Sequence, residues 1–129
     1  MTDYRTITNP ALLPTVRSEP LMQAIEGMPC SLRIASFVPG LRCAPPETVV
    51  GCHLPGISKG VGHKNTDLAV AAGCSVCHDI LDGRDRARSD YIAANYPAAL
   101  QERLNRALQE TQARLVGLGI ITVKGFEVE

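Results

Sequence analysis

The clearest hydrophobic pattern lies in the last third of the chain, where apolar residues recur three and four positions apart. The stripe runs through Leu100, Leu104, Ala107, Leu108, Thr111 and Leu115. This spacing places its members on one face of a helix. Pro97 suits a first helical turn, and Gly117 and Gly119 are natural stops. We therefore predict a long helix over 98–116 whose stripe packs against the rest of the chain.

Shorter apolar runs predict that strands accompany this helix. The β-branched run Thr48–Val50, which continues to Leu54, favours a strand, and Ile120–Val123 predicts a last strand before a turn at Lys124-Gly125. Pro39-Gly40 marks a turn between Cys30 and Cys43. Together with the long helix, these runs predict an α+β fold.

The N-terminal region differs in composition from the rest. Four prolines in the first 29 residues, Pro10, Pro14, Pro20 and Pro29, interrupt any long element. We expect residues 1–26 to be an irregular Pro-rich arm with at most a short helix near Leu21–Glu26, and residues 27–129 to be a single domain. A length of 129 residues fits one domain.

Charge and hydropathy narrow the class of protein. Thirteen basic and thirteen acidic residues give a net charge of zero, so a nucleic-acid partner would need a local basic surface. We expect no transmembrane helix and no signal peptide, because no apolar run reaches about 18 residues and the start lacks a charged region before an apolar core. These features predict a cytoplasmic protein without a membrane partner.

Four of the five cysteines are spaced for a metal site. Cys74 and Cys77 have the spacing of a zinc knuckle, and Cys30 and Cys43 could join them if the segment between them folds as a hairpin or knuckle. In the cytosol such cysteines are metal ligands more often than disulfides. We predict a four-cysteine structural Zn²⁺ site; the alternative is reduced cysteines packed as small hydrophobic side chains.

Two histidines are candidates for chemistry. His53 follows Cys52 in the predicted strand, so the two side chains should point to opposite faces, with Cys52 in the core. His78 follows Cys77 directly and is either a fourth zinc ligand or a ligand for a second, harder metal ion. Asp79 and Asp82 either assist such an ion or cap a helix. His63 lies in a glycine-rich loop, which either contacts substrate or is simply solvated.

These residues occur in an order that resembles the HNH (His-Me finger) nucleases, and more closely the small prophage-encoded predicted nucleases of the YbcO type. The resembling stretches are Cys30-Ser-Leu-Arg33-Ile34, Pro46-Glu47-Thr48 followed by His53, Gly60-Val-Gly-His-Lys64, Asp67-Leu68, and Cys74-Ser-Val-Cys77-His78-Asp79 through Asp82 and Arg84. They span about residues 27–90. The resemblance implies a small ββα-metal core, HNH-like, with a structural zinc site and a long C-terminal helix.

The resemblance also implies roles for individual residues. His53 would be the general base, and His78 would bind a catalytic divalent ion, Mg²⁺ or Mn²⁺. Cys52 stands where many HNH enzymes have an acidic residue, and Asp67 and Asn65 lie near the position of the middle asparagine. The implied activity is metal-dependent DNA endonuclease cleavage in a bacterial host, phage or prophage derived, in recombination or DNA processing.

Basic residues around this motif predict where DNA would bind. Lys59, Lys64, Arg84, Arg86 and Arg88 are candidates for contacts with backbone phosphates. The alternative for the arginines is a solvated helix start paired with Asp85 and Asp90. The alternative for the whole protein is a non-catalytic zinc-binding module that binds nucleic acid or a protein partner. A homodimer through the leucine-striped helix is compatible with either function.

Overall fold

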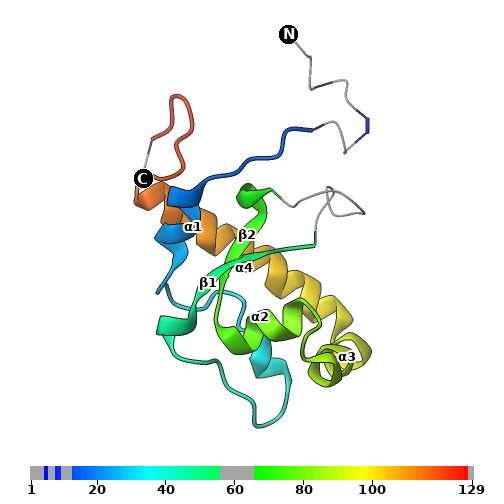
Figure 1. Cartoon of the computed structure of the whole chain (residues 1–129). Coiled ribbons are helices and arrows are strands. Elements are labelled where there is room, and N and C mark those ends of the chain that lie inside the picture. Colours follow the sequence, from blue (N-terminus) through cyan, green and yellow to red (C-terminus); the bar gives the residue numbers. More distant parts are fainter. Residues whose placement is uncertain (1–4, 6–7, 10–12, 56–65, 128–129) are drawn as a thin grey trace.

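The computed structural model describes residues 5, 8–9, 13–55 and 66–127. Within these ranges, the chain forms four α-helices and a small antiparallel sheet of two strands, with α3 (Arg86–Asn95) beside α2 (Ser75–Leu81) and α4 (Pro97–Gly117) and away from the sheet (Figure 1). The predicted α+β class is therefore confirmed. Lys59, His63, Lys64 and Asn65 lie outside the described residues.

The sheet consists of β1 (Val50–His53) and β2 (Val70–Gly73), paired so that Val50 faces Gly73 and His53 faces Val70. The first strand was predicted from the β-branched residues that lead into it. The second was not, because its Val-Ala-Ala-Gly run is buried along its whole length and lacks the alternation that reveals a half-exposed strand.

The outer edge of β2 is covered by hydrogen bonds from two other segments. The backbone N–H of Ala72 donates to Oγ1 of Thr111, at 3.0 Å, and the carbonyl of Ala72 accepts from the amides of Ser31 and Leu32, at 2.8 and 3.1 Å. A buried strand edge needs such partners, because an unpaired backbone group away from water is costly. The long helix is thus fixed to the sheet by a polar contact as well as by packing.

The long helix, α4 (Pro97–Gly117), matches the predicted range and crosses behind the sheet (Figure 1). Its buried residues are Leu104, Ala107, Thr111 and Leu115, all members of the predicted stripe. The stripe therefore packs within the chain, as expected.

The prediction of a last strand at 120–123 is wrong. Gly119 adopts a left-handed backbone conformation with φ of 73°, and the amides of Ile120 and Ile121 both donate to the carbonyl of Leu115, at 2.9 and 3.2 Å. These bonds cap the C-terminus of α4. The β-branched run has no strand partner in the described structure. The turn at Lys124-Gly125 is confirmed by the bond from the Phe126 amide to the carbonyl of Val123.

The segment between the first two cysteines is not a hairpin. It contains a 3₁₀-helix, η3 (Ile34–Phe37), and a turn at Pro39-Gly40, where Gly40 has φ of 77°. Ile34 and Ala35 are buried, so the apolar residues of this segment form a single helical turn against the core and not the strands of a hairpin. The turn at Pro39-Gly40 was predicted correctly.

The short helix expected near 21–26 is α1 (Glu19–Ile25). Ser18 caps it, since the amide of Leu21 donates to the Ser18 hydroxyl at 3.2 Å. Leu21 and Ile25 are buried against β1, so the folded core includes this helix. The other elements are η4 (Pro46–Thr48), η5 (Asp67–Ala69), α2 (Ser75–Leu81) and α3 (Arg86–Asn95).

The third helix, α3, was not predicted as a separate element. Ile92 is its only buried residue, so its sequence shows no apolar stripe.

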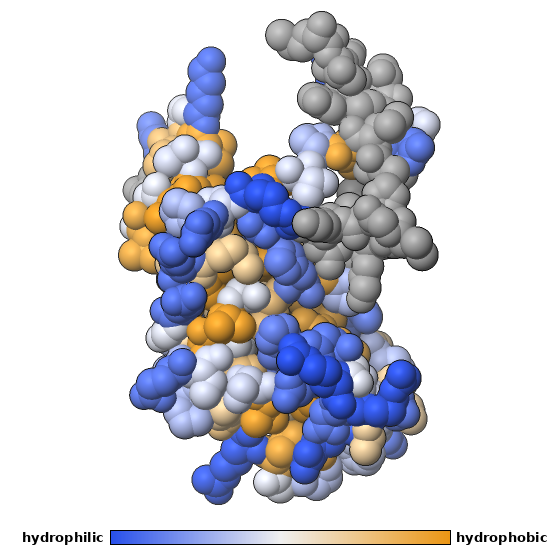
Figure 2. Space-filling model, viewed as in Figure 1, coloured by the Kyte–Doolittle hydropathy of each residue, from blue (hydrophilic) through white to orange (hydrophobic). Residues whose placement is uncertain are grey.

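On the face shown in Figure 2, hydrophobic residues form small patches among hydrophilic ones. No helix in the described part of the chain has both the length and the apolar character needed to cross a bilayer.

Candidate functional site

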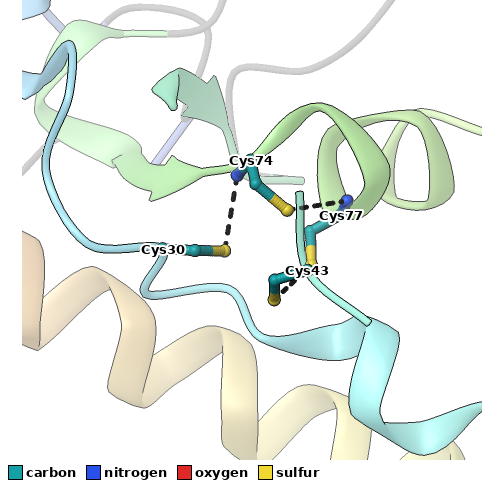
Figure 3. A group of neighbouring side chains, drawn as sticks. All are labelled: Cys30, Cys43, Cys74 and Cys77. Carbon is teal, nitrogen blue, oxygen red and sulfur yellow. Dashed lines mark hydrogen bonds between the residues drawn. The ribbon is translucent and has the colours of Figure 1, made fainter. Parts of the chain in front are cut away.

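The four predicted zinc ligands meet at one point although they come from distant parts of the chain. The sulfur atoms of Cys30, Cys43, Cys74 and Cys77 all lie within 4.8 Å of one another (Figure 3). Those of Cys43 and Cys77 are 3.7 Å apart. Tetrahedral zinc with Zn–S bonds of about 2.3 Å places its sulfurs about 3.8 Å apart. The cluster therefore fits a metal ion such as zinc, and it uses four cysteines without His78.

Two tight turns bring these cysteines to the corner between β2 and α2. Cys74 is the N-cap of α2, and its sulfur accepts from the Cys77 amide at 3.4 Å. On the other side, Arg33 adopts a left-handed conformation with φ of 46°, which aims its amide at the Cys30 sulfur, 3.5 Å away. Cys43 arrives on the loop that follows η3 (Figure 3).

Backbone amides surround the sulfurs. Cys30 also accepts from the amide of Cys74 at 3.3 Å, Cys77 accepts from Ala35 at 3.4 Å, and Cys74 accepts from Ala44 at 3.3 Å. Amide donors favour the ionised form of a thiol, which is the form that binds metal. This is a second feature, independent of the sulfur distances, that suits a thiolate metal centre.

The pKa values of the thiols indicate what a cation would contribute to the cluster. The hydrogen bond from the Cys77 thiol, helped by amide donors, lowers the pKa of Cys30 to about 5. Burial raises the pKa of Cys43 to about 11, and the bond to Cys30 together with burial raises that of Cys77. The protein alone thus favours one thiolate with protonated neighbours, and a divalent cation would be needed to balance several thiolates together.

Cys52, the fifth cysteine, is fully buried and belongs to the hydrophobic core, as predicted. Burial raises its pKa to about 12. Its side chain fits because residue 73 on β2 is glycine: a Cβ added to Gly73 would lie 2.7 Å from the Cys52 sulfur and 2.4 Å from Cδ1 of Leu32.

His53 lies on the opposite face of β1 and pairs with a buried carboxylate. Its Nε2 is 2.9 Å from Oδ1 of Asp67, whose side chain is only 7% exposed, whereas that of His53 is 33% exposed. An ionised carboxylate only accepts hydrogen bonds, so Nε2 of a neutral His53 carries the proton. This arrangement leaves Nδ1 as the basic nitrogen. A half-exposed imidazole oriented by a carboxylate can accept a proton from a water molecule.

Asp67 is in turn held by residues of the N-terminal arm. Its Oδ2 accepts from the amide of Ser18 at 2.7 Å, and its Oδ1 lies 3.3 Å from the guanidinium of Arg17. The arm also pairs with the backbone here, because the Asp67 amide donates to the carbonyl of Val16 at 2.9 Å, and the Val16 amide donates to Oγ1 of Thr66 at 3.1 Å.

Burial would raise the pKa of Asp67, but the hydrogen bonds from the Ser18 amide and from His53 outweigh it and keep that pKa below its usual range. The sequence placed Asp67 near the motif without giving it a role, and it predicted the arm but not the contact of the arm with Asp67. The serine N-cap before Glu19-Pro20 was the one local signal at Ser18. Nothing local indicates that this amide reaches a carboxylate 49 positions away.

His78 lies in the middle of α2, half-buried, with its Nε2 3.7 Å from Oδ2 of Asp82. Asp82 also accepts from Arg84, whose Nε and guanidinium nitrogen lie 2.8 and 2.5 Å from Oδ2. The hydrogen bonds from Arg84 lower the pKa of Asp82. In the ranges 13–55 and 66–127, His78 and His53 have different partners and no hydrogen bond joins them.

The predicted basic stripe is largely paired with acidic side chains. Arg84 contacts Asp82 and Asp79, and Arg88 contacts Asp85 at 2.9 Å. Asp85 is also the N-cap of α3. Among the described residues, Arg86 has no hydrogen-bond or ion-pair partner. One alternative for the stripe was pairing with Asp85 and Asp90. The structure contains the pairing with Asp85, whereas Asp90 takes no part in the ion pairs of the described structure.

Comparison with known proteins decides the family. The sequence model of the family described as "Putative nuclease YbcO" matches residues 19–118. The chain belongs to the YbcO family. It is 37% identical over 78 residues, which are 59% of this chain and 72% of the relative, to "Putative nuclease YbcO" of Escherichia coli K12. A protein of Enterobacteria phage 82 with the same description matches with the same identity and coverage. No solved structure matched.

The YbcO match covers the whole of the cysteine cluster, both histidines and α4. It begins at Glu19, so Val16, Arg17 and Ser18 lie outside it. The resemblance inferred from sequence is thus confirmed, and the contact between the arm and Asp67 belongs to a segment beyond the family match.

Proposed function

We propose that this protein is a metal-dependent DNA endonuclease of the HNH type, phage or prophage derived, that hydrolyses phosphodiester bonds. The observation that supports this proposal is the pair formed by His53 and Asp67, because it provides an oriented, half-exposed base on a YbcO-family fold whose four-cysteine cluster could hold zinc. The strand–strand–helix order of β1, β2 and α2 agrees with an HNH-like core. A role in DNA recombination or processing would fit the phage relative.

In this mechanism His53 accepts a proton from the attacking water through Nδ1. Asp67 is a positioning residue: it holds the imidazole through Nε2 and stabilises the imidazolium that forms. Because Asp67 is fixed by the Ser18 amide and Arg17, the ring is oriented before substrate arrives. The cysteine cluster, which would hold structural zinc, fixes the start of α2 relative to the segment after α1.

His78 would bind the catalytic Mg²⁺ or Mn²⁺, and Asp82 is the nearest carboxylate that could share it. Magnesium sites often have only one or two carboxylates and are completed by water and substrate phosphate. Such an ion, when bound, would stabilise negative charge on the scissile phosphate and the leaving oxygen. Asp82 would then exchange its contact with Arg84 for the ion. Lys59, Lys64, Arg84, Arg86 and Arg88 remain the proposed phosphate contacts.

One observation favours the alternative of a non-catalytic zinc-binding module. In the part of the chain that the structure describes, the four-cysteine cluster is the only group of three or more side chains arranged to hold a metal ion. A module that used only this centre would bind nucleic acid without cleaving it. The two functions differ in whether His53 matters for a chemical step.

A plasmid-nicking assay tests the proposal. Zinc-loaded wild type should nick supercoiled DNA only when Mg²⁺ or Mn²⁺ is added, and His53→Ala should lower the rate by about 10²- to 10⁴-fold. His78→Ala should instead raise the concentration of Mg²⁺ or Mn²⁺ that is needed. Asp90→Asn, an exposed substitution prepared in the same way, should leave the rate unchanged.

The assay also has outcomes that contradict the proposal. If His53→Ala nicks as fast as wild type, His53 is not the base and the activity has another source. If zinc-loaded wild type is inert on duplex, single-stranded and junction DNA with both metal ions, the binding-module function is adopted instead.

A further inference from the structure

Three aromatic side chains of the described chain form a cluster at the surface. None of the fully buried core residues is aromatic, yet three of the five aromatic residues form one cluster. The rings of Phe37 and Tyr96 are stacked with centroids 5.5 Å apart, and Tyr91 lies 6.4 Å from Tyr96. Tyr91 and Tyr96 are 36% and 41% exposed. Aromatic rings that the core does not use are common at binding surfaces.

A groove leads away from this cluster along α4. A hollow of about 220 Å³ is lined by Phe37, Ala99, Glu102, Arg103 and Arg106. A second hollow, of about 280 Å³, is lined by Arg33, Arg103, Arg106, Gln109 and Glu110. Because the two hollows share Arg103 and Arg106, they form one groove, with an aromatic ring at one end and Arg33 at the other. We call it the α4 groove.

The charges in the α4 groove favour an anion. Arg33 and Arg103 share the single carboxylate of Glu110, with Arg33 2.7 Å from it, and Arg106 pairs with Glu102 at 2.8 Å. Three guanidinium groups thus face two carboxylates. The pair of Arg106 and Glu102 is 65% exposed on both sides, so it is weak and readily exchanged for a phosphate contact.

Arg103 has an unused donor in the same place. Its Nε is buried and has no hydrogen-bond partner among the described residues, although its guanidinium nitrogen contacts Glu110. A buried N–H without an acceptor is unfavourable. Guanidinium groups bind phosphate through two parallel N–H donors, so a phosphate oxygen would supply the missing acceptor once the Arg103 side chain turns its Nε toward the groove.

We propose that the α4 groove binds an unpaired nucleotide of the DNA substrate, with its base stacked on Phe37 and its phosphate on Arg103 and Arg106. A nucleotide is the ligand class that combines a flat ring with an adjacent phosphate. Bases inside a duplex are already stacked, so an aromatic platform selects single-stranded DNA, and it does so without sequence preference. The nature of the substrate rests on the proposed nuclease function, whereas the binding site itself does not.

The groove differs from the predicted phosphate contacts at 84–88. It is lined by Arg33, by Phe37 of η3 and by residues of α4 between Ala99 and Glu110, and none of its lining residues lies in the segment from His53 to Arg84. The protein would therefore grip a single-stranded branch on this face while cleavage takes place elsewhere, as expected for a nuclease that acts on flaps or junctions.

Fluorescence anisotropy with a labelled single-stranded oligonucleotide, and with the duplex of the same sequence, tests this proposal. Zinc-loaded protein is used without Mg²⁺ or Mn²⁺, so that cleavage does not interfere. Phe37→Leu should weaken single-strand binding about tenfold and leave duplex binding unchanged. Arg106→Ala, at an exposed position where folding is not at risk, should weaken single-strand binding and reduce the slope of log affinity against log salt by about 1.

Lys124→Ala is the control, because it also removes one positive charge but lies in the tail at the other end of α4 (Figure 1). Single-strand affinity that is the same in wild type, Phe37→Leu and Arg106→Ala overturns the groove, even if the protein nicks plasmid DNA. Groove-dependent single-strand binding by a protein that never nicks DNA supports the groove and contradicts only the nuclease function.

Discussion

At the scale of single residues, Asp67 connects three parts of the chain. Its carboxylate receives hydrogen bonds from the arm through Ser18 and from β1 through His53, while its amide pairs with Val16. A buried carboxylate without these donors would be strongly unfavourable. The residue that orients the proposed base is therefore also the residue that holds the arm against the fold.

The depressed pKa of Asp67 makes this contribution dependent on pH. At pH 7, Asp67→Asn should lower the free energy of unfolding by about 2 kcal/mol, because charged hydrogen bonds are replaced by weaker ones. The folded-state pKa lies below the unfolded value of about 3.9, so the difference between variant and wild type is fully present above about pH 4. It declines below that pH and is lost once the pH falls below the folded-state pKa.

Urea unfolding of both proteins at pH 7 and at about pH 3 measures this difference. Asp90→Asn, at an exposed position, should show no change at either pH. A difference between Asp67→Asn and wild type that stays constant into the acid range would mean that folding does not lower the pKa of Asp67.

At the scale of elements, the sequence predicted α4 but not β2, although the two elements are in contact. The stripe of α4 repeats over several turns, so its spacing alone identifies a helix. Four consecutive buried residues in β2 carry no periodic signal, and their strand conformation depends on pairing with β1 and on the bonds from Thr111 and Ser31. Likewise, Ile120–Val123 has strand-forming residues, but no strand of the described structure pairs with it.

Thr111→Val tests the polar contact between α4 and β2. Valine has nearly the same shape but leaves the buried Ala72 amide without an acceptor, so the free energy of unfolding should fall by about 1–3 kcal/mol. Thr122→Val, at an exposed position in the tail, is the matched control and should change stability little. Equal stability of the two variants in urea unfolding would show that the Thr111 hydroxyl does not hold the helix to the sheet.

At the scale of the whole molecule, the cysteine cluster joins segments that the small core alone holds weakly. In the described ranges, none of the buried core residues is aromatic and the sheet has two strands. Domains with such limited packing are commonly stabilised by a metal ion. We therefore expect the folded state to depend on the ion.

Zinc removal tests this dependence. Wild type should bind one zinc ion per chain, and a strong chelator should lower its thermal unfolding temperature sharply, because metal binding and folding are coupled. Cys43→Ser should lose tight zinc binding, whereas Cys52→Ala should keep one zinc per chain, since Cys52 is a core residue. Metal analysis together with thermal unfolding measures both effects. Zinc binding that survives in Cys43→Ser and is lost in Cys52→Ala would contradict the assignment.

The sequence by itself determined the features that depend on local spacing and on residue type. The cysteine spacings indicated a four-ligand metal centre, the leucine stripe indicated the long helix, and the order of motifs indicated the YbcO family. Each of these features can be recognised without knowledge of the fold, because helical periodicity repeats over a few residues and zinc sites use a small set of ligand types.

Only the tertiary structure decided the contacts between residues that are distant in sequence. The pairing of His53 with Asp67, its support by Ser18, and the α4 groove all join side chains brought together by the packing of helices on the sheet. No local pattern encodes such contacts, because their geometry depends on how every intervening segment folds. The sequence determined which groups are available for chemistry, and the packing decided which of them meet.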